Sequence, residues 1–534
     1  MYPSADRDVR PGFTDAAQYT RRQALVSAAR LPALGIAVEL GLTGPSLAQI
    51  VSTSGGPRAQ DTKIWRALSR VGYGPTPSLL AALQATGSPQ NWALQQVDAA
   101  RAASQRPPAI AADLAGINAP LTDIFAAARR ERELRQQVKA NANGNPDSVA
   151  RPPVAALRRM DFSAPAAPEL AIQRLVQQAA AWHLSSCSLP ELENPLLARM
   201  TEFWFNHLNV YVGKGPVRPF VGHYLVNVIR AHALGHFEDL LLASARHPAM
   251  LLYLDQAQSV ADGSPGAQGQ KRGLNENYAR ELMELHTLGV NGGYTQRDVH
   301  ELARVLTGWT VGPQQDSGFR FAGRLHDNGI KQVLGQTFPA TRFAVGEQEG
   351  VDAIRMLARH PATARRISLR LAQFFVADKP ASALVEQLSH TFLASDGDIS
   401  AMLSTLFASH DFWDPQNRLF KTPMDFACSA LTVTQGAADP DRHALVLAAG
   451  YLAGAGQPLH GWQTPDGYPF DAATWMVPEA LTRRADFALA LARQRPEPDF
   501  LQPFLSGNTL ATVAGEPPGL RAGLMIASPD FMSK

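Results

Sequence analysis

The sequence predicts a mainly α-helical protein. Apolar residues recur every three or four positions in "NPLLARMTEFWFNHLNVYV" and in "PFVGHYLVNVIRAHALGHFEDLLLAS", which is the spacing of one helix face. The alternation of apolar and polar residues that is typical of half-buried strands is scarce. The chain has 534 residues, of which 45% are hydrophobic, enough for one large core or for two or three smaller ones. We therefore expect an all-α, multi-helix globular body.

Residues 1–55 are predicted to be an export signal and leader that precede the fold. Arg21 and Arg22 stand before a moderately apolar run, "LPALGIAVELGLTGPSLAQ", and this order is typical of the twin-arginine route for folded proteins. Ser46 and Ala48, on either side of Leu47, then have the spacing that a signal peptidase recognises. Arg30, just before the quoted run, and Glu39, inside it, interrupt the apolar region, as they would in an ordinary helix. We expect a bacterial protein exported to the periplasm or the extracellular space.

Three helical regions are expected after the leader, at residues 56–150, 151–345 and 346–534. The candidate linkers between helices are rich in Gly, Pro and Asn: "ANGNPDSVARPP" near 143–153, "DGSPGAQGQKRG" at 262–273 and "GPQQDSG" at 312–318. Whether the three regions are separate domains or one body is left open by the sequence.

One segment departs from the helical pattern. In "GFRFAGRLHDNGIKQVLGQTF", residues 318–338, Phe319 and Phe321 alternate with other residues and glycines break the run. This pattern predicts a small hairpin or a folded loop inserted between helices.

Composition excludes some classes of protein. The formal net charge is only +2 and no Lys/Arg-rich run occurs, so the sequence does not predict nucleic-acid binding. No window after the leader has the roughly 18 uncharged apolar residues of a membrane span. The two cysteines, Cys187 and Cys428, either form one long-range disulfide outside the cytoplasm or are two buried thiols.

The segment "NENYARELMELHTLGVNGGYTQRDV", residues 275–299, is the strongest candidate for a functional site. On a helix, Glu281 and Glu284 lie about 60° apart and share a face, whereas His286 faces the other way. Arg280 is placed to pair with Glu284 at i,i+4. Two such carboxylates can act as general acid and base, can coordinate a hard cation, or can be internal struts paired with arginines.

The helix that follows has a predicted beginning and end. Gly292 and Gly293 break the preceding helix, and Thr295 then caps a new one, with Asp298 three residues later as the capping-box acid. The helix is expected to stop at Gly308.

A second group of polar residues occurs in "LHDNGIKQVLG". His326 and Asp327 are adjacent and Lys331 follows, so they could supply an acid with its orienting partner; Asp327-Asn328-Gly329 is otherwise a turn. His207 is either a buried core histidine or a member of the site, and Trp309 either packs in the core or contacts a sugar ring. We interpret "TPDGYP", residues 464–469, as a turn.

Taken in order, these and other motifs resemble one bacterial family, the domain of unknown function numbered 1800. The motifs are "LSRVGYGPT" (68–76), "FWFNHL" (203–208), "IRAHALGHFEDLL" (229–241), "HPAMLLYLD" (247–255), "LNENYARELMELHTLGVNGGYTQRDVHELARVLTGW" (274–309), "HDNGIKQVLG" (326–335), "HPATARRISLRLAQFFVAD" (360–378) and "GQPLHGWQTPDGYP" (456–469) with Trp475 and Arg483. The resemblance spans roughly residues 62–490. Phe205 departs from the family pattern, which usually has a polar residue there, often histidine.

The resemblance implies a bacterial, largely helical and frequently exported protein. The resemblance also implies a partner protein, because members of this family are often encoded beside an exported protein with a sulfatase-like core. It implies no general activity, so the chemistry must be argued from the residues themselves.

Three functional hypotheses follow. The first is a hydrolase or lyase that acts on an extracellular or envelope polymer, a glycan above all, by carboxylate acid–base chemistry. The second is a hydrolase that depends on a divalent metal, for which the sequence assigns no ligands. The third is a non-catalytic envelope module that docks on an exported partner. The candidate catalytic residues are Glu281, Glu284, His326 and Asp327, and the candidate substrate-binding residues are Arg280, Arg304, Lys331, Asn277, Tyr278, Trp309 and His207, with His286 in support.

Overall fold

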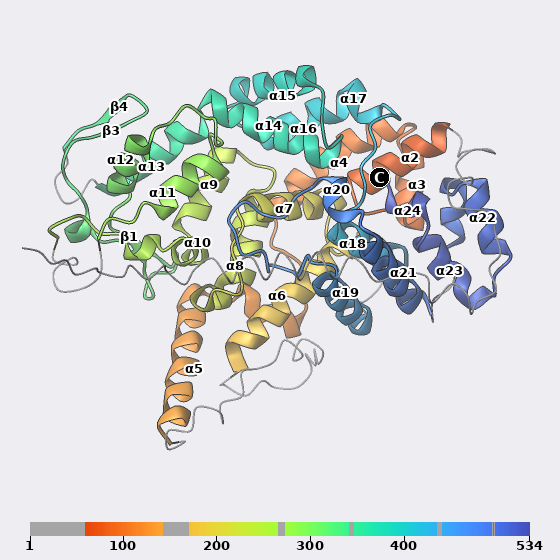
Figure 1. Ribbon diagram of the computed structural model, residues 1–534, viewed down its shortest axis with the longest axis horizontal. Helices are drawn as coiled ribbons and strands as arrows, with labels where there is room; N and C mark the ends of the chain where they lie inside the picture. The colour runs from red at the N-terminus through yellow and green to blue at the C-terminus, as the bar shows by residue number, and fades with distance from the viewer. Residues whose placement is uncertain are drawn as a thin grey trace, which may run out of the picture. The chain divides into compact units, whose positions relative to one another are not determined.

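The computed structural model describes residues 59–141, 170–264, 273–340, 346–434, 441–493, 495 and 497–534. Its regular structure is almost entirely helical (Figure 1), which confirms the predicted all-α class. The predicted export signal, the linker near 143–153 and most of the linker at 262–273 lie outside these residues.

The helices up to residue 258 include 3-10 segments and one π-helical segment, η6. They are α2 (Ala59–Arg70), α3 (Pro77–Ala85), α4 (Pro89–Ser104), η1 (Ala112–Asn118), α5 (Leu121–Asn141), α6 (Ala171–Ser188), α7 (Pro195–His207), η5 (Gly215–Phe220), α8 (Val221–Tyr224), η6 (Leu225–Arg230), α9 (Phe237–Arg246), α10 (Pro248–Tyr253) and η7 (Gln256–Gln258).

The later helices include a second π-helical segment, η8. They are α11 (Asn277–Glu281), η8 (Leu282–His286), α12 (Gln296–Val305), η9 (Gly323–Leu325), α13 (Gly346–Ala358), α14 (Pro361–Phe375), α15 (Ser382–Ala394), α16 (Ile399–Ala408), α17 (His410–Trp413), α18 (Pro423–Thr434), α19 (Arg442–Gly454), α20 (Ala472–Trp475), α21 (Pro478–Ala492), η10 (Asp499–Phe504), α22 (Gly507–Ala514), α23 (Pro518–Ile526) and α24 (Pro529–Met532).

The insertion predicted at 318–338 takes part in two small antiparallel sheets. Strand β2 (Phe319–Phe321) pairs with β1 (Trp309–Val311), which lies upstream of the predicted range, and the linker at 312–318 joins them. Strand β3 (Lys331–Val333) pairs with β4 (Gln336–Phe338). The Phe319/Phe321 alternation therefore marks a real strand, whose partner the sequence did not identify.

One hydrophobic core runs through all three predicted helical regions, from Ala67 to Met532. Helix α7 lies in the middle of the described body (Figure 1) and is buried on nearly all sides. Burial around most of the circumference is typical of a central helix, and the polar side chains that α7 buries are paired, as Arg199 is with Asp425. In α7, Trp204 contacts Phe203 and Phe237, and its indole N–H donates to the backbone oxygen of Ala233.

The two cysteines form a disulfide. Cys187 in α6 is bonded to Cys428 in α18, 241 residues later. Of the two alternatives that the sequence left open, the structure selects the long-range bridge. Within the described part of the chain, none of the helices combines the length and the apolar content that a membrane crossing requires.

The loop at 456–470, which includes "TPDGYP", is fixed to the end of α7 by two asparagines. Asn206 bonds to both the backbone N–H and the oxygen of Tyr468, and Asn209 donates to the oxygens of Trp462 and Thr464. Gly467 has a φ of +74° and lies so close to Asn206 that any Cβ would collide with its backbone. The core thus holds this loop in one place.

Candidate functional site

The segment predicted as one helix from residue 275 changes its geometry at Glu281. The α-helical turn α11 ends there, and Leu282–His286 forms the π-helical turn η8. Thr287 closes this turn, because its hydroxyl donates to the oxygen of Leu282 at 2.6 Å. Single π-helical turns are rare and occur frequently at functional sites.

Two half-buried carboxylates flank the start of the π turn. The carboxylate of Glu281 makes no hydrogen bond or ion pair to any residue that the structure describes, and the carboxylate of Glu284 accepts one hydrogen bond, from the Tyr294 hydroxyl at 3.2 Å. Burial, and then the negative charge of Glu284, raise the pKa of Glu281. A carboxyl group in this state retains its proton to a higher pH than a free glutamic acid does.

The predicted pairing of Arg280 with Glu284 is wrong. Arg280 instead donates to Glu276, four residues before it, at 3.2 Å, and to Gln296 of α12 at 2.9 Å. The physical reason is the π turn, whose extra residue per turn moves Glu284 away from the place that an α-helix would give it. Glu284 therefore lacks the ion pair with Arg280 that the sequence suggested, and the charge of Arg280 acts on Glu281 only to lower its pKa, against the larger effect of burial.

A third carboxylate joins the two glutamates from the loop at 456–470. Asp466 is exposed and accepts hydrogen bonds from the Trp462 indole at 2.8 Å and the Thr464 hydroxyl at 2.6 Å. Its charge adds to the factors that raise the pKa of Glu281. We call Glu281, Glu284 and Asp466 the carboxylate cluster.

Tyr253, at the end of α10, lies beside the carboxylate cluster. Burial raises the pKa of its phenol, and the charges of Glu281 and Asp466 raise this pKa further. Its hydroxyl donates to the oxygen of Gln463 at 2.8 Å, so the tyrosine also supports the loop that carries Asp466.

Two arginines of α14 supply positive charge to the cluster. Arg366 donates to the oxygen of Leu285, within the π turn, at 2.9 Å; burial lowers its pKa, and the charge of Glu284 acts in the opposite direction. Arg370 lies over the ring of Phe470 at 4.4 Å, and burial lowers its pKa to about 10. The charge of Asp466 acts on Arg370 in the direction that favours its charged form.

Two buried histidines lie behind this layer. The Nε2 atom of His207 is 3.0 Å from the backbone oxygen of His286, and since a carbonyl oxygen only accepts, this nitrogen carries the proton. Burial lowers the pKa of His207 well below its usual value and lowers that of His286 to about 3, so both rings are neutral. His286 is buried whereas Glu284 is half exposed, which agrees with the prediction that their side chains point to opposite sides of the helix.

The second predicted group, around His326, forms a separate and sealed cluster. Lys331 is fully buried and donates to Glu349 at 2.6 Å, and His326 lies 3.3 Å from the same carboxylate. The other ring nitrogen of His326 bonds to the oxygen of Thr307 at 2.8 Å. Buried groups that neutralise one another in this way are structural struts, and Glu349, which the sequence did not identify, is their centre.

Arg304 and Asp327 belong with this second group. Arg304 donates to Asp327 at 2.8 Å and to Glu301 at 2.8 Å, and these bonds raise its pKa. Asp327 also accepts from the backbone N–H of Gly329, as the turn interpretation predicts. Among the residues in the structure's described ranges, no hydrogen bond or ion pair joins this group to the carboxylate cluster, so the proposed single site divides in two.

The remaining candidates hold the framework. Trp309 is fully buried against Phe319 at 5.1 Å, and Tyr278 is fully buried too, so neither presents a face to a substrate. Asn277 donates to the oxygen of Leu254 at 3.3 Å and thereby fixes the start of α11. In the described segments, no three side chains of His, Cys, Asp or Glu converge so as to hold a metal ion.

Four residues of the site were missed by sequence reasoning. Asp466 was assigned to a turn, which is correct for the backbone but overlooks the carboxylate that the turn presents. Tyr253, Arg366 and Arg370 lie inside "HPAMLLYLD" and "HPATARRISLRLAQFFVAD", two of the motifs that carry the family resemblance. The signal was thus present, but only the fold shows that these distant motifs meet.

Comparison with known families gives one match over nearly the whole chain. The family model described as "Protein of unknown function (DUF1800)" matches residues 66–532. No curated protein and no solved structure matches the chain.

Proposed function

The chain belongs to the DUF1800 family, whose description assigns no activity, and from its own site residues we propose that it is an exported hydrolase or lyase acting on an extracellular or envelope glycan. The observation that carries the proposal is Glu281. It is a half-buried carboxyl with a raised pKa and, within the described residues, no hydrogen-bond partner. Structural carboxylates are normally paired, whereas a general acid needs a proton that it can give away.

The chemistry assigns a role to each member of the cluster. Glu281 gives its proton to the glycosidic oxygen as the bond to that oxygen breaks. A second carboxylate, Glu284 or Asp466, takes a proton as base, in a hydrolase from the water that attacks the sugar carbon and in a lyase from the sugar itself, or it stabilises positive charge on the sugar ring. Arg366 and Arg370 attract anionic groups of the polymer toward the cluster. His207 and His286 act through Arg366 and the π turn as positioning residues.

Two further features support export. The disulfide between Cys187 and Cys428 fits a protein that matures in an oxidising compartment, and the twin arginine at 21 and 22 fits the corresponding signal. We include in the proposal a co-encoded exported protein with a sulfatase-like core as a partner. A fusion of residues 1–55 to a reporter that is active only after export tests the signal, and a double-lysine variant of Arg21 and Arg22 is the control.

The test of the activity compares two variants of the carboxylate cluster, Glu281→Gln and Glu284→Gln, and one control variant on a panel of envelope and matrix glycans. Glu281→Gln removes the proton donor and should reduce the release of reducing or unsaturated ends by about 10²-fold or more. Glu276→Gln is the matched control, because Glu276 lies on the same helix but is paired with Arg280 and His300. Full activity of both Glu281→Gln and Glu284→Gln would overturn the proposal and favour the docking module.

The pH profile gives an independent prediction. Because the acid must be protonated and the pKa of Glu281 is raised above 4.5, activity should persist above pH 4.5 and fall about tenfold per pH unit beyond the raised pKa. This descending limb should be absent from the residual activity of Glu281→Gln. A limb that is identical in the variant would assign the titration to another group.

A further inference from the structure

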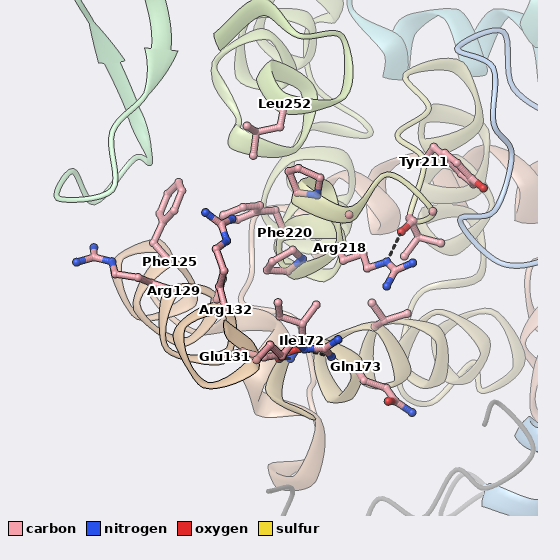
Figure 2. Close-up of a pocket in the computed structure, with 18 of the residues that line it drawn as sticks. Phe125, Arg129, Glu131, Arg132, Ile172, Gln173, Tyr211, Arg218, Phe220 and Leu252 are labelled. Atoms are coloured by element: carbon pink, nitrogen blue, oxygen red, sulfur yellow. Dashed lines mark hydrogen bonds and ion pairs between the residues drawn. The ribbon is translucent and has the colours of Figure 1, made fainter. Parts of the chain in front are cut away.

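A large groove lies between α5, α6 and the segment from Tyr211 to Phe220 (Figure 2). Its volume is about 1020 Å³, at the upper end of the range for ligand sites. Two of its lining residues, Leu252 and Gly461, directly precede Tyr253 and Trp462, which support the carboxylate cluster. The groove lining and the residues that support the carboxylate cluster are therefore adjacent in the sequence at two places.

The groove has an excess of positive charge. Arg129 and Arg132 of α5 are exposed, and the guanidinium group of neither makes a hydrogen bond or ion pair to any residue in the described part of the chain. At a spacing of three residues they share one helix face, with a rise of about 4.5 Å between them. Arg218 lies across from them (Figure 2); its Nε atom donates to the oxygen of Val212 at 3.1 Å.

The carboxylate in the lining does not cancel this charge. Glu131 is buried and already paired with Arg135 at 2.6 Å, and it accepts the backbone N–H of Ile172 at 2.7 Å. Arg129, Arg132 and Arg218 are thus left to attract an anion. Guanidinium groups bind carboxylates through paired, parallel hydrogen bonds.

Apolar and aromatic side chains lie between the cations. The partly exposed ring of Phe125 packs against the buried ring of Phe220, with ring centres 4.6 Å apart and planes tilted at 55°, and Ile172 and Val176 of α6 continue the partly exposed apolar surface. Aromatic faces pack well on the C–H edges of sugar rings. An acidic peptide or a lipid headgroup would use the arginines but would not need an apolar surface of this extent.

We propose that this groove binds an acidic oligosaccharide, a chain whose sugars carry carboxylates, and that it is the binding subsite of the polymer degraded at the carboxylate cluster. Only the second part of this proposal, that the bound polymer is degraded at the carboxylate cluster, rests on the proposed function. The substrate class is an anionic glycan, because the arginines of the groove and the arginines of α14 both attract a negatively charged polymer.

Calorimetry with the full chain tests the proposal, using oligogalacturonate as the probe and a neutral glucan oligomer of the same length as its control. The acidic oligomer should bind at least tenfold more tightly, and higher salt should weaken it. The double variant Arg129→Ala/Arg132→Ala should lose at least tenfold in affinity. Arg130→Ala is the matched control, because Arg130 is an exposed neighbour that does not line the groove.

Results that contradict these expectations overturn the proposal. Equal binding by Arg130→Ala and the double variant, or by the acidic and the neutral oligomer, rejects the groove as the site. Tighter binding of polyglutamate or of phosphatidylglycerol vesicles than of the oligosaccharide replaces the glycan with an acidic peptide or a membrane surface. If Glu281→Gln loses activity but still binds the oligosaccharide, both proposals are supported. If the double variant Arg129→Ala/Arg132→Ala keeps full affinity and full activity, only the groove proposal is rejected.

Discussion

Glutamates of this chain lie in two opposite environments. Glu349, with Lys331 and His326, shows the first. All three are buried; the Glu349 carboxylate lies 2.6 Å from Lys331 and 3.3 Å from His326, and Lys331 and His326 lie 3.4 Å apart. Glu281 has the same chemistry as Glu349 but is half exposed and has no partner among the described residues. Burial together with pairing indicates a strut, whereas partial burial without pairing is the environment on which the proposed acid role of Glu281 rests.

The strut makes a prediction about stability. Lys331→Met leaves the Glu349 carboxylate buried without its ammonium partner and should lower the free energy of unfolding by about 3–5 kcal/mol, measured in urea. Adding Glu349→Met removes the orphan charge and should recover most of this loss. Lys63→Met on the exposed face of α2 is the control and should change stability by less than about 0.5 kcal/mol. An equal effect of Lys331→Met and Lys63→Met would contradict the assignment.

At the scale of elements, the sequence located helix boundaries well where side chains cap them. Thr295 and Asp298 form the predicted capping box, and Asp298 also accepts the backbone N–H of Leu334. The helix ends at Val305, before the predicted stop at Gly308, which does adopt a positive φ of 85°. Caps are local hydrogen bonds, so the sequence suffices to predict them.

The π turn is the element that sequence could not predict, and Thr287 tests it. Thr287→Val keeps the shape of this buried side chain but removes its bond to Leu282, so it should lower the free energy of unfolding by about 1 kcal/mol. Because the turn positions Glu281 and Glu284, glycan cleavage should fall by up to about 10²-fold.

The control for this prediction is Thr512→Val. Thr512 makes a similar bond to the oxygen of Asn508 on the exposed helix α22, far along the chain from the site. It should leave cleavage unchanged. Unchanged cleavage in Thr287→Val would show that the π turn does not set the position of the carboxylates.

At the scale of the whole molecule, the disulfide links two helices of one core. Removing the bridge between Cys187 and Cys428 should lower the free energy of unfolding by about 2–5 kcal/mol, because it closes a loop of 241 residues in the unfolded chain. Urea unfolding with and without dithiothreitol measures the effect. The double variant Cys187→Ala/Cys428→Ala should not respond to the reductant, and two reactive thiols in the untreated folded protein would contradict the bridge.

The sequence by itself determined the helical class and the family, because helical periodicity, capping and motif order depend on neighbouring residues. It also singled out the two glutamates as site candidates, which stay a prediction. It also placed His326, Asp327, Lys331 and Arg304 with them, although these lie in a separate cluster.

Only the tertiary structure brought Tyr253, Arg366 and Arg370 to the carboxylate cluster and Asp466 to Glu281, and only it paired Arg280 with Glu276. The physical reason is that partial burial, charge coupling and pairing depend on which distant segments meet, and this is decided by packing around one shared core.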